Sequence, residues 1–265
     1  MKLVTTLTET NKEHEVLVLV HGLGSAATAF KPIVNKLSQG FRVITIDLPG
    51  HGKTPYESSQ KLDPRSLGQA IFDSIESEYG VRQFHIAGNS LGGWIALEMA
   101  ADQPERIKTL VGLAPAGLWI KPASSRLPSE ARSHYMAKTL KPFIKKGLHL
   151  KAMRAIGFST VSPKWQELSY EICYDAAYAM AHSAGYFQAW DGMLGKRFDS
   201  EVPPTVPVTI LFGDTDNTLP YPVSQERSLA PSHCTWLVID SCGHAPMWDH
   251  PDLVASIIRD VISKG

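Results

Sequence analysis

The residues from Gly88 to Gly92 combine a serine with the glycines that a sharp turn needs. They read Gly-Asn-Ser-Leu-Gly, follow the apolar run 84–87 and precede residues 94–100, which have a helical composition. In a strand, turn, helix setting, the G-x-S-x-G pattern lifts the serine clear of the sheet edge. Side chains two positions before or after the serine would obstruct this turn, so glycines are expected there. The pattern predicts that Ser90 is an activated nucleophile and that the backbone N–H of Leu91, at a helix N-terminus, donates to an oxyanion.

A serine hydroxyl is a weak nucleophile at neutral pH and needs an imidazole base, which in turn needs a carboxylate partner. After such a turn, the expected order along the chain is serine, acid, histidine. His244 fits best among the ten histidines, because it follows Gly243 in a loop just beyond the last predicted strand. For the acid we prefer Asp216, because the analogous acid after such a serine turn usually stands three residues past the glycine that ends this strand, here Gly213. The alternative, Asp214, is expected to cap the turn through its side chain.

A second oxyanion donor is expected from the loop that follows the apolar run 15–20. This loop reads His21-Gly22-Leu23-Gly24 and leads into a helical pattern. The backbone N–H of Leu23 is the preferred donor, with that of Gly24 second.

Apolar runs alternate with helical patterns along most of the chain. Strands are predicted at 15–20, 41–46, 83–87, 108–114, 206–212 and around Trp236, and residues 3–8 could add an edge strand. Helices are predicted at 26–37, 64–79, 91–101, near 221–229 and at 253–262. Repeated strand and helix units with short connections indicate an α/β fold with a doubly wound, mostly parallel sheet.

The alternation is interrupted between residues 117 and 205. Four X-Pro steps divide this region into segments of helical periodicity, of which 165–182 is the longest. We therefore predict a core formed by residues 1–117 and 205–265, and a helical cap formed by residues 118–204. Ligands of open α/β sheets bind at the carboxyl ends of the strands, so an inserted cap would form the lid of the pocket.

These segments together resemble the α/β-hydrolase superfamily. The resemblance rests on the serine turn, the His21-Gly22 loop, the segment 47–52 (Asp-Leu-Pro-Gly-His-Gly), the acid loop 213–216 and the Gly243-His244 loop, all in the expected chain order. It implies a sheet of about eight strands with a lid after the sixth, although only one short strand can precede residue 15 here. By the same resemblance, Ser90, Asp216 and His244 form a catalytic triad, with Leu91 and Leu23 as oxyanion donors.

The superfamily hosts several chemistries, so the fold alone does not fix the reaction. Haloalkane dehalogenases and epoxide hydrolases carry an aspartate at the turn, and Ser90 argues against both. We expect a carboxylesterase that cleaves small to medium, largely apolar esters through an acyl-enzyme. The alternative is a carbon–carbon bond hydrolase of the meta-cleavage-product type. Such enzymes use a cap arginine to grip an acidic substrate, and the candidates are Arg126, Arg132, Arg154 and Arg197.

Two further alternatives stay open. A small-molecule receptor on the same fold could retain the triad and act through cap movement. Cofactor-free perhydrolase activity is less favoured, because the proline usual in the oxyanion loop is absent. Aromatic and apolar side chains are expected to line the pocket, namely Trp119, Trp165, Tyr186, Phe187, Trp190, Met247 and Trp248, whereas Trp94 is expected to pack beneath the serine turn.

Composition excludes several classes of function. The chain has 265 residues, 26 basic and 26 acidic, so its formal charge of zero predicts neither a nucleic-acid partner nor a membrane partner. The three cysteines, Cys173, Cys234 and Cys242, are expected to be free thiols, and no metal or cofactor motif is present. The N-terminus lacks a secretory signal pattern. We therefore expect a soluble, cytoplasmic enzyme that acts on a small-molecule ester without a cofactor or metal; its oligomeric state is left open.

Overall fold

A seven-stranded sheet forms the centre of the protein in a computed structural model that describes residues 2–8, 11–126 and 128–264. The strands are β1 (Val4–Thr8), β2 (Val16–Val20), β3 (Arg42–Asp47), β4 (Phe84–Asn89), β5 (Ile107–Leu113), β6 (Val208–Gly213) and β7 (Thr235–Ile239). Their order across the sheet is β1-β3-β2-β4-β5-β6-β7, and every neighbouring pair is parallel except β1 with β3. The predicted α/β class and mostly parallel sheet are therefore confirmed.

The central strands are short apolar runs because both faces of the sheet are covered. All five residues of β2 and all six of β4 and β6 are buried. Continuous apolar runs of this length are typical of strands buried on two sides. The antiparallel edge strand β1 is only partly buried, as a strand at the edge should be.

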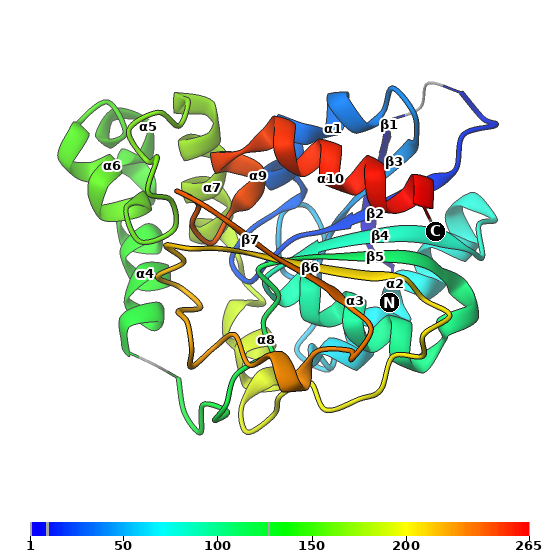
Figure 1. The fold of residues 1–265 in the computed structure, drawn as a ribbon. Coiled ribbons are helices and arrows are strands. Elements are labelled where there is room, and N and C mark those ends of the chain that lie inside the picture. The colour runs from blue at the N-terminus through cyan, green and yellow to red at the C-terminus, as the bar shows by residue number, and fades with distance from the viewer. Residues whose placement is uncertain (1, 9–10, 127, 265) are drawn as a thin grey trace.

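Helices pack on both faces of the sheet (Figure 1). One face carries α1 (Lys31–Leu37) and α10 (Pro251–Lys264), which share a core cluster with Leu17 and Leu19 of β2. The other face carries α2 (Pro64–Tyr79) and α3 (Leu91–Asp102), which share a second cluster with Val18 and Val20. Successive side chains of β2 thus pack in two separate cores, because side chains along a β-strand point alternately to the two faces of the sheet.

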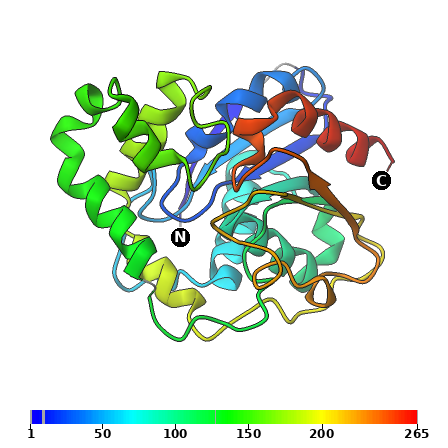
Figure 2. The same cartoon turned by 60° about the vertical axis from the view of Figure 1, so that its left-hand side comes forward.

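Five α-helices lie between β5 and β6 in the described part of the chain. They are α4 (Pro128–Leu140), α5 (Ile144–Gly147), α6 (Lys151–Phe158), α7 (Tyr170–His182) and α8 (Tyr186–Met193). Figures 1 and 2 show them gathered at one end of the sheet, and we call residues 114–207 the helical insertion. Shorter helices complete the chain: η1 (Ala27–Phe30), η2 (Pro104–Arg106), η3 (Lys141–Phe143), η4 (Arg227–Leu229) and α9 (Pro246–Asp249).

Two predicted helices differ from the structure. The prediction of a helix near 221–229 is wrong. Only the short η4 forms there, and the other residues are in turns or have no regular structure. Pro220 and Pro222 lack the backbone N–H groups that a longer helix needs for its hydrogen bonds. The helix expected over 165–182 begins only at Tyr170, where the Ser169 hydroxyl caps it by accepting from the N–H of Ile172 at 3.2 Å.

The structure also bears on the remaining expectations from composition. All three cysteines are free thiols. Within the described ranges, no helix has the length and apolar character needed to cross a membrane. The same part of the chain holds no group of three or more histidine, cysteine, aspartate or glutamate side chains arranged to bind a metal ion.

Candidate active site

Ser90 lies on a strained turn between β4 and α3. Its backbone angles are φ 54° and ψ −118°, a region that residues with a side chain rarely adopt. The neighbouring glycines make this turn possible, since a Cβ on Gly88 would lie 2.2 Å from the Gly92 carbonyl oxygen and one on Gly92 would lie 2.1 Å from that of Val20. The Ser90 N–H donates to the carbonyl oxygen of Leu113 in β5 at 3.0 Å, which ties the turn to the sheet. Backbone strain of this kind persists only where the surrounding structure fixes the conformation. At Ser90, the strained turn presents the side-chain hydroxyl.

His244 and Asp216 form a hydrogen-bonded pair. The distance between His244 Nδ1 and Asp216 Oδ2 is 2.9 Å, and both residues are buried. An ionised carboxylate can only accept hydrogen bonds, so His244 carries its proton on Nδ1 and leaves Nε2 free to exchange a proton. The two residues come from loops that follow neighbouring parallel strands, Asp216 after β6 and His244 after β7. A carboxylate that orients an imidazole in this way is one part of a serine–histidine–acid arrangement. No hydrogen bond between Ser90 and His244 is recorded among the described residues.

The surroundings of Asp216 favour its ionised form. Burial alone would raise the pKa of its carboxyl group, but the charge and hydrogen bond of His244 act in the opposite direction. The backbone N–H groups of Thr218 and Leu219 both donate to Asp216 Oδ1 at 2.8 Å and lower the pKa further. The net effect holds the pKa of Asp216 below its ordinary value, so the carboxylate stays charged beside the imidazole.

Asp214 makes different contacts from Asp216. Its side chain is exposed, and its Oδ1 accepts from the N–H of Cys242 at 3.1 Å. It bridges the loops after β6 and β7 and makes no recorded contact with His244 in the described chain. Of the two carboxylates considered from the sequence, it is therefore Asp216 that contacts the imidazole.

The loop after β2 lies against the nucleophile. A Cβ on Gly22 would be 2.9 Å from the Cβ of Ser90, so the backbone at Gly22 approaches the serine closely. The Leu48 N–H donates to His21 Nε2 at 3.0 Å, which places the imidazole proton on Nδ1, and this proton is donated to the Gly22 carbonyl oxygen at 2.8 Å. In a trans peptide the C=O and N–H point in opposite directions, so the N–H of Leu23 points away from His21. Within the described residues, neither Leu23 nor Leu91 has a recorded acceptor for its N–H.

The loop that carries His244 is held from two sides. The Asn89 side chain, next to the nucleophile, donates from Nδ2 to the His244 carbonyl oxygen at 3.0 Å. From the helical insertion, the Val161 carbonyl oxygen accepts from the His244 N–H at 2.7 Å. The buried carboxylate of Asp249 accepts from the Gly243 N–H at 2.7 Å and from the Ser162 hydroxyl. These supports could not be predicted from the sequence, because no local pattern pairs residues 161 and 162 with a loop some eighty positions later.

The residues expected to line a pocket occupy different environments. Tyr186 is buried beside the loop after β2, since a Cβ on Gly24 would lie 2.9 Å from its ring and 2.6 Å from Met180, a neighbour that the sequence did not suggest. Trp190 packs on Tyr186 with 5.8 Å between ring centroids. Met247 is 1% exposed and packs in the core shared with α1 and α10.

The remaining aromatic candidates mainly contact other side chains or the backbone of the protein. Trp248 donates to the Ala29 carbonyl oxygen at 2.9 Å, and both Trp165 and Trp248 pack against the small core of the insertion. Trp119 meets Trp94 edge-on at 5.2 Å, and the buried Trp94 donates to Glu98 within α3. Phe187 lies under the guanidinium of Arg126, 4.4 Å from the ring centroid.

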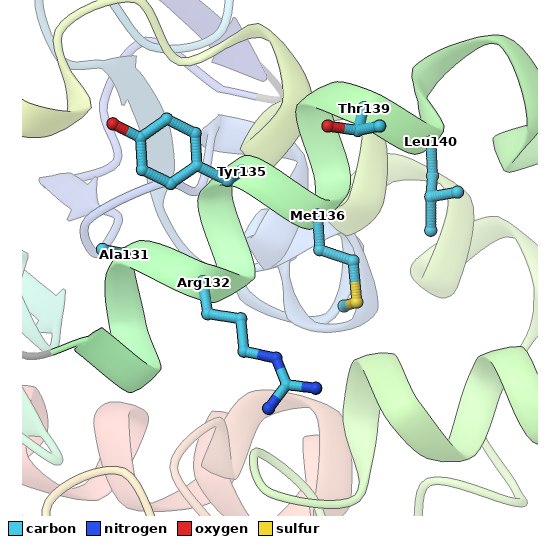
Figure 3. Close-up of a pocket in the computed structure, with 6 residues that line it drawn as sticks. All are labelled: Ala131, Arg132, Tyr135, Met136, Thr139 and Leu140. Atoms are coloured by element: carbon cyan, nitrogen blue, oxygen red, sulfur yellow. The ribbon is translucent and has the colours of Figure 1, made fainter.

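Three of the four candidate arginines are bound to the protein. Arg126 forms a two-point ion pair with Asp191, Arg154 donates to the Leu168 carbonyl oxygen and Arg197 donates to that of Ile120. Arg132 has no recorded hydrogen bond or ion pair to the part of the chain that the structure describes. It is exposed and lines an open surface hollow of about 630 Å³ with five other residues of α4, namely Ala131, Tyr135, Met136, Thr139 and Leu140. Figure 3 shows the Arg132 guanidinium and the Met136 side chain directed to the same side of α4.

Comparisons with known proteins identify the family of the chain. The model of the alpha/beta hydrolase family matches residues 17–257. A pimeloyl-[acyl-carrier protein] methyl ester esterase from Aliivibrio salmonicida is 26% identical over 92% of this chain and 90% of its own length. A 2-hydroxy-6-oxononadienedioate/2-hydroxy-6-oxononatrienedioate hydrolase from a Pseudomonas species is 23% identical over 94% of this chain and 88% of its own.

Solved structures show the same fold. A carboxylesterase from Bacillus subtilis superposes with a TM-score of 0.73 at 16% identity, covering 100% of this chain and 93% of its own. A meta-cleavage product hydrolase from Pseudomonas fluorescens gives a TM-score of 0.73 at 18% identity, covering 99% and 95%. The family model spans nearly the whole sheet and all the loops described above, and the chain therefore belongs to the α/β-hydrolase family.

Proposed function

We propose that this protein is a serine hydrolase that cleaves carboxylic esters through an acyl-enzyme. The observation that carries the proposal is the buried hydrogen bond between His244 and Asp216, on a loop tied to the strained turn that presents Ser90. The curated relatives named as methyl ester esterases are consistent with it.

In the proposed reaction, Ser90 Oγ attacks the ester carbonyl carbon while its proton passes to His244 Nε2. Asp216 stabilises the imidazolium, and the N–H groups of Leu23 and Leu91 receive the negative charge that develops on the carbonyl oxygen. The alcohol departs with the proton from His244. A water molecule, deprotonated by His244, then attacks the acyl-enzyme and releases the carboxylic acid with Ser90 restored.

We further propose that residues 118–204 act as a cap over the substrate. Tyr186 and Met180 of the insertion lie against the Gly24 backbone in the loop that would supply an oxyanion donor. Their apolar surfaces favour uncharged acyl groups of small to medium size. Trp190, behind Tyr186, would support this wall.

A chain-length series of p-nitrophenyl esters tests the proposal. The wild-type protein is expected to turn over many times per site, with a preference for one range of acyl lengths. Ser90→Ala should lose nearly all turnover while its circular dichroism is unchanged, whereas Ser263→Ala on the exposed face of α10 should match the wild type. A single acyl burst without further turnover would instead favour a receptor, and an unaltered rate in Ser90→Ala would exclude the mechanism.

Arg132 supports one second candidate, the hydrolysis of a carbon–carbon bond in an acidic vinylogous diketone. Its guanidinium is exposed, is unpaired within the described residues and lies beside apolar side chains of α4, so it is available to pair with a substrate carboxylate. Arg132→Gln should then raise the KM for an acidic diketone at least about tenfold and leave neutral esters unaffected. Arg197→Gln is the matched control. Absence of diketone cleavage by the wild-type protein would exclude this candidate and leave the esterase proposal intact.

A further inference from the structure

Residues 141–158 concentrate positive charge in a chain whose formal charge is zero. They contain four lysines and one arginine and no aspartate or glutamate. The segment runs through η3, α5 and α6, and Figures 1 and 2 show α5 and α6 at the outer end of the insertion, away from the sheet. Basic and acidic residues are equal in number over the whole chain, so this segment is a local excess that the net charge conceals.

The same segment exposes large apolar side chains. Phe143, Leu150 and Ile156 are 63%, 61% and 59% exposed, respectively. Exposure here does not reflect a missing core, because Ile144, Leu148 and Phe158 of the same segment are buried in the cluster that includes Cys173 of α7. The segment therefore has an inner side that stabilises the insertion and an outer side that presents apolar groups to solvent.

Four lysines of the segment are also exposed, and one of them, Lys145, has its Nζ 5.8 Å from the centroid of the Tyr174 ring. Lys141, Lys145, Lys146 and Lys151 are all exposed, and none has a recorded ion pair with the residues that the structure describes. Arg154 differs, since its guanidinium is bound to the Leu168 carbonyl oxygen. We call these four lysines together with Phe143, Leu150 and Ile156 the outer basic surface. Unpaired lysines around protruding apolar side chains are the composition of protein segments that lie in a membrane interface.

We propose that the outer basic surface docks on an anionic lipid surface. The lysines would contact lipid phosphates, and the three apolar side chains would enter the boundary between headgroups and acyl chains. A second copy of this chain is a poor occupant, because two such surfaces would bring like charges together. An acidic protein would satisfy the lysines but would need three separate pockets for side chains that project outward, so a deformable lipid surface fits better. Docking of this kind needs no membrane-spanning helix, and it does not depend on the proposed reaction.

Sedimentation with lipid vesicles tests the proposal. The full chain is mixed with vesicles of phosphatidylcholine alone or with 30% phosphatidylglycerol, at about 50 mM and about 500 mM salt, since screening shortens the reach of the charges at high salt. We expect binding to the anionic vesicles at low salt, weakening at high salt, and little binding to the neutral vesicles. Lys145→Glu/Lys146→Glu should lower the partition coefficient at least about tenfold. Phe143→Ser/Leu150→Ser should also lower it, since apolar burial contributes to binding.

A matched control separates this surface from net charge. Lys12→Glu/Lys264→Glu changes the total charge equally, at exposed positions on the connection after β1 and at the end of α10, across the molecule from α5 and α6 (Figure 1). This control should bind vesicles within about twofold of the wild type. Circular dichroism and hydrolysis of a water-soluble ester should be unchanged in all variants, which shows that they fold.

Three results would overturn the proposal: no binding to anionic vesicles at low salt, equal losses in the control and in Lys145→Glu/Lys146→Glu, or binding that the apolar variants leave intact. Binding to soluble polyglutamate without binding to vesicles would point to an acidic protein and would also overturn it. A failure of ester hydrolysis would bear only on the proposed function, because vesicle binding is measured without substrate.

Discussion

Two buried histidines should make the protein lose stability in acid well before its carboxylates are titrated. His21 and His51 are 0% and 1% exposed, with 5.5 Å between their ring centroids. Burial lowers the pKa of His21 to about 4. Burial, with a further contribution from the neighbouring His21, lowers the pKa of His51 to about 3. Both groups are neutral in the folded protein at pH 7, and Leu48 donates a hydrogen bond to the unprotonated nitrogen of His21.

The sign and size of the effect follow from these values. An unfolded histidine with the ordinary pKa of 6.5 takes up a proton first as the pH falls, so stability is full above pH 6.5 and is lost on the way down to the folded pKa. Each such histidine costs about 1.4 kcal/mol per pH unit in that window. For His51 the loss at pH 4 is about 3 kcal/mol, a large part of the roughly 5–15 kcal/mol that stabilises a typical domain.

His51→Asn isolates this contribution. The Asn amide can replace His51 Nδ1 as the donor to the Pro49 carbonyl oxygen but cannot be protonated. Urea unfolding followed by tryptophan fluorescence at pH 7, 6, 5 and 4.5 should show the wild type losing about 1.4 kcal/mol per pH unit more than the variant below pH 6.5. His149→Asn, at an exposed imidazole, should keep the wild-type slope. Parallel pH dependences for the wild type and His51→Asn would refute the reasoning.

Three further predictions concern catalysis and are measured as kcat and KM on p-nitrophenyl esters. Asp216→Asn should lower kcat by about three to four orders of magnitude, because the N–H groups of Thr218 and Leu219 hold the amide oxygen and the amide NH2 then faces His244 Nδ1, which favours the wrong imidazole tautomer. Asp214→Asn should stay within about threefold of wild type; comparable losses would reject the assignment of the acid. Gly22→Ala should lower kcat by about 100-fold, since the new Cβ would lie 2.9 Å from that of Ser90 and displace an oxyanion donor; an unchanged kcat would place the donor elsewhere. Asp249→Ala should lower kcat about tenfold with little change in KM, and Asp249→Asn should restore most of it, because an amide oxygen can still accept from the Gly243 N–H. Equal losses in both Asp249 variants, or a change in KM alone, would contradict a positioning role for this carboxylate.

The strands and the serine turn could be predicted because local rules govern them. Continuous apolar runs mark strands that are buried on both faces, and Gly88 and Gly92 are required by contacts of 2.1–2.2 Å that any Cβ would make. The choice of Asp216 over Asp214 also came from spacing along one loop. The hydrogen bond between Asp216 and His244 joins two loops that follow adjacent strands.

The helical insertion was predicted less well than the sheet, because the limits and contacts of its helices depend on residues that are far apart in the sequence. Helical periodicity indicated its class, but the start of α7 depends on the Ser169 cap, which the periodic pattern did not reveal. The candidate arginines could not be separated from sequence, since Asp191 and Leu168, which bind two of them, lie 65 and 14 positions away. Net charge likewise averages over the chain and conceals the lysines of residues 141–158.

The contacts at Val161 limit how the insertion can move. Its carbonyl oxygen accepts from the His244 N–H, and the backbone at Gly243 approaches so closely that a Cβ there would lie 2.3 Å from the same oxygen. If the whole insertion moved as one body, the loop carrying His244 would lose this hydrogen bond together with the one between Ser162 and Asp249. We therefore expect residues 161–163 to stay on the core while substrate enters. The start of α8 is tied to the core in the same way, since the Gly185 N–H donates to the Gly50 carbonyl oxygen at 3.1 Å. We therefore expect access to Ser90 to come from rotamer changes of Tyr186 and Met180 beside Gly24, which break no backbone hydrogen bond.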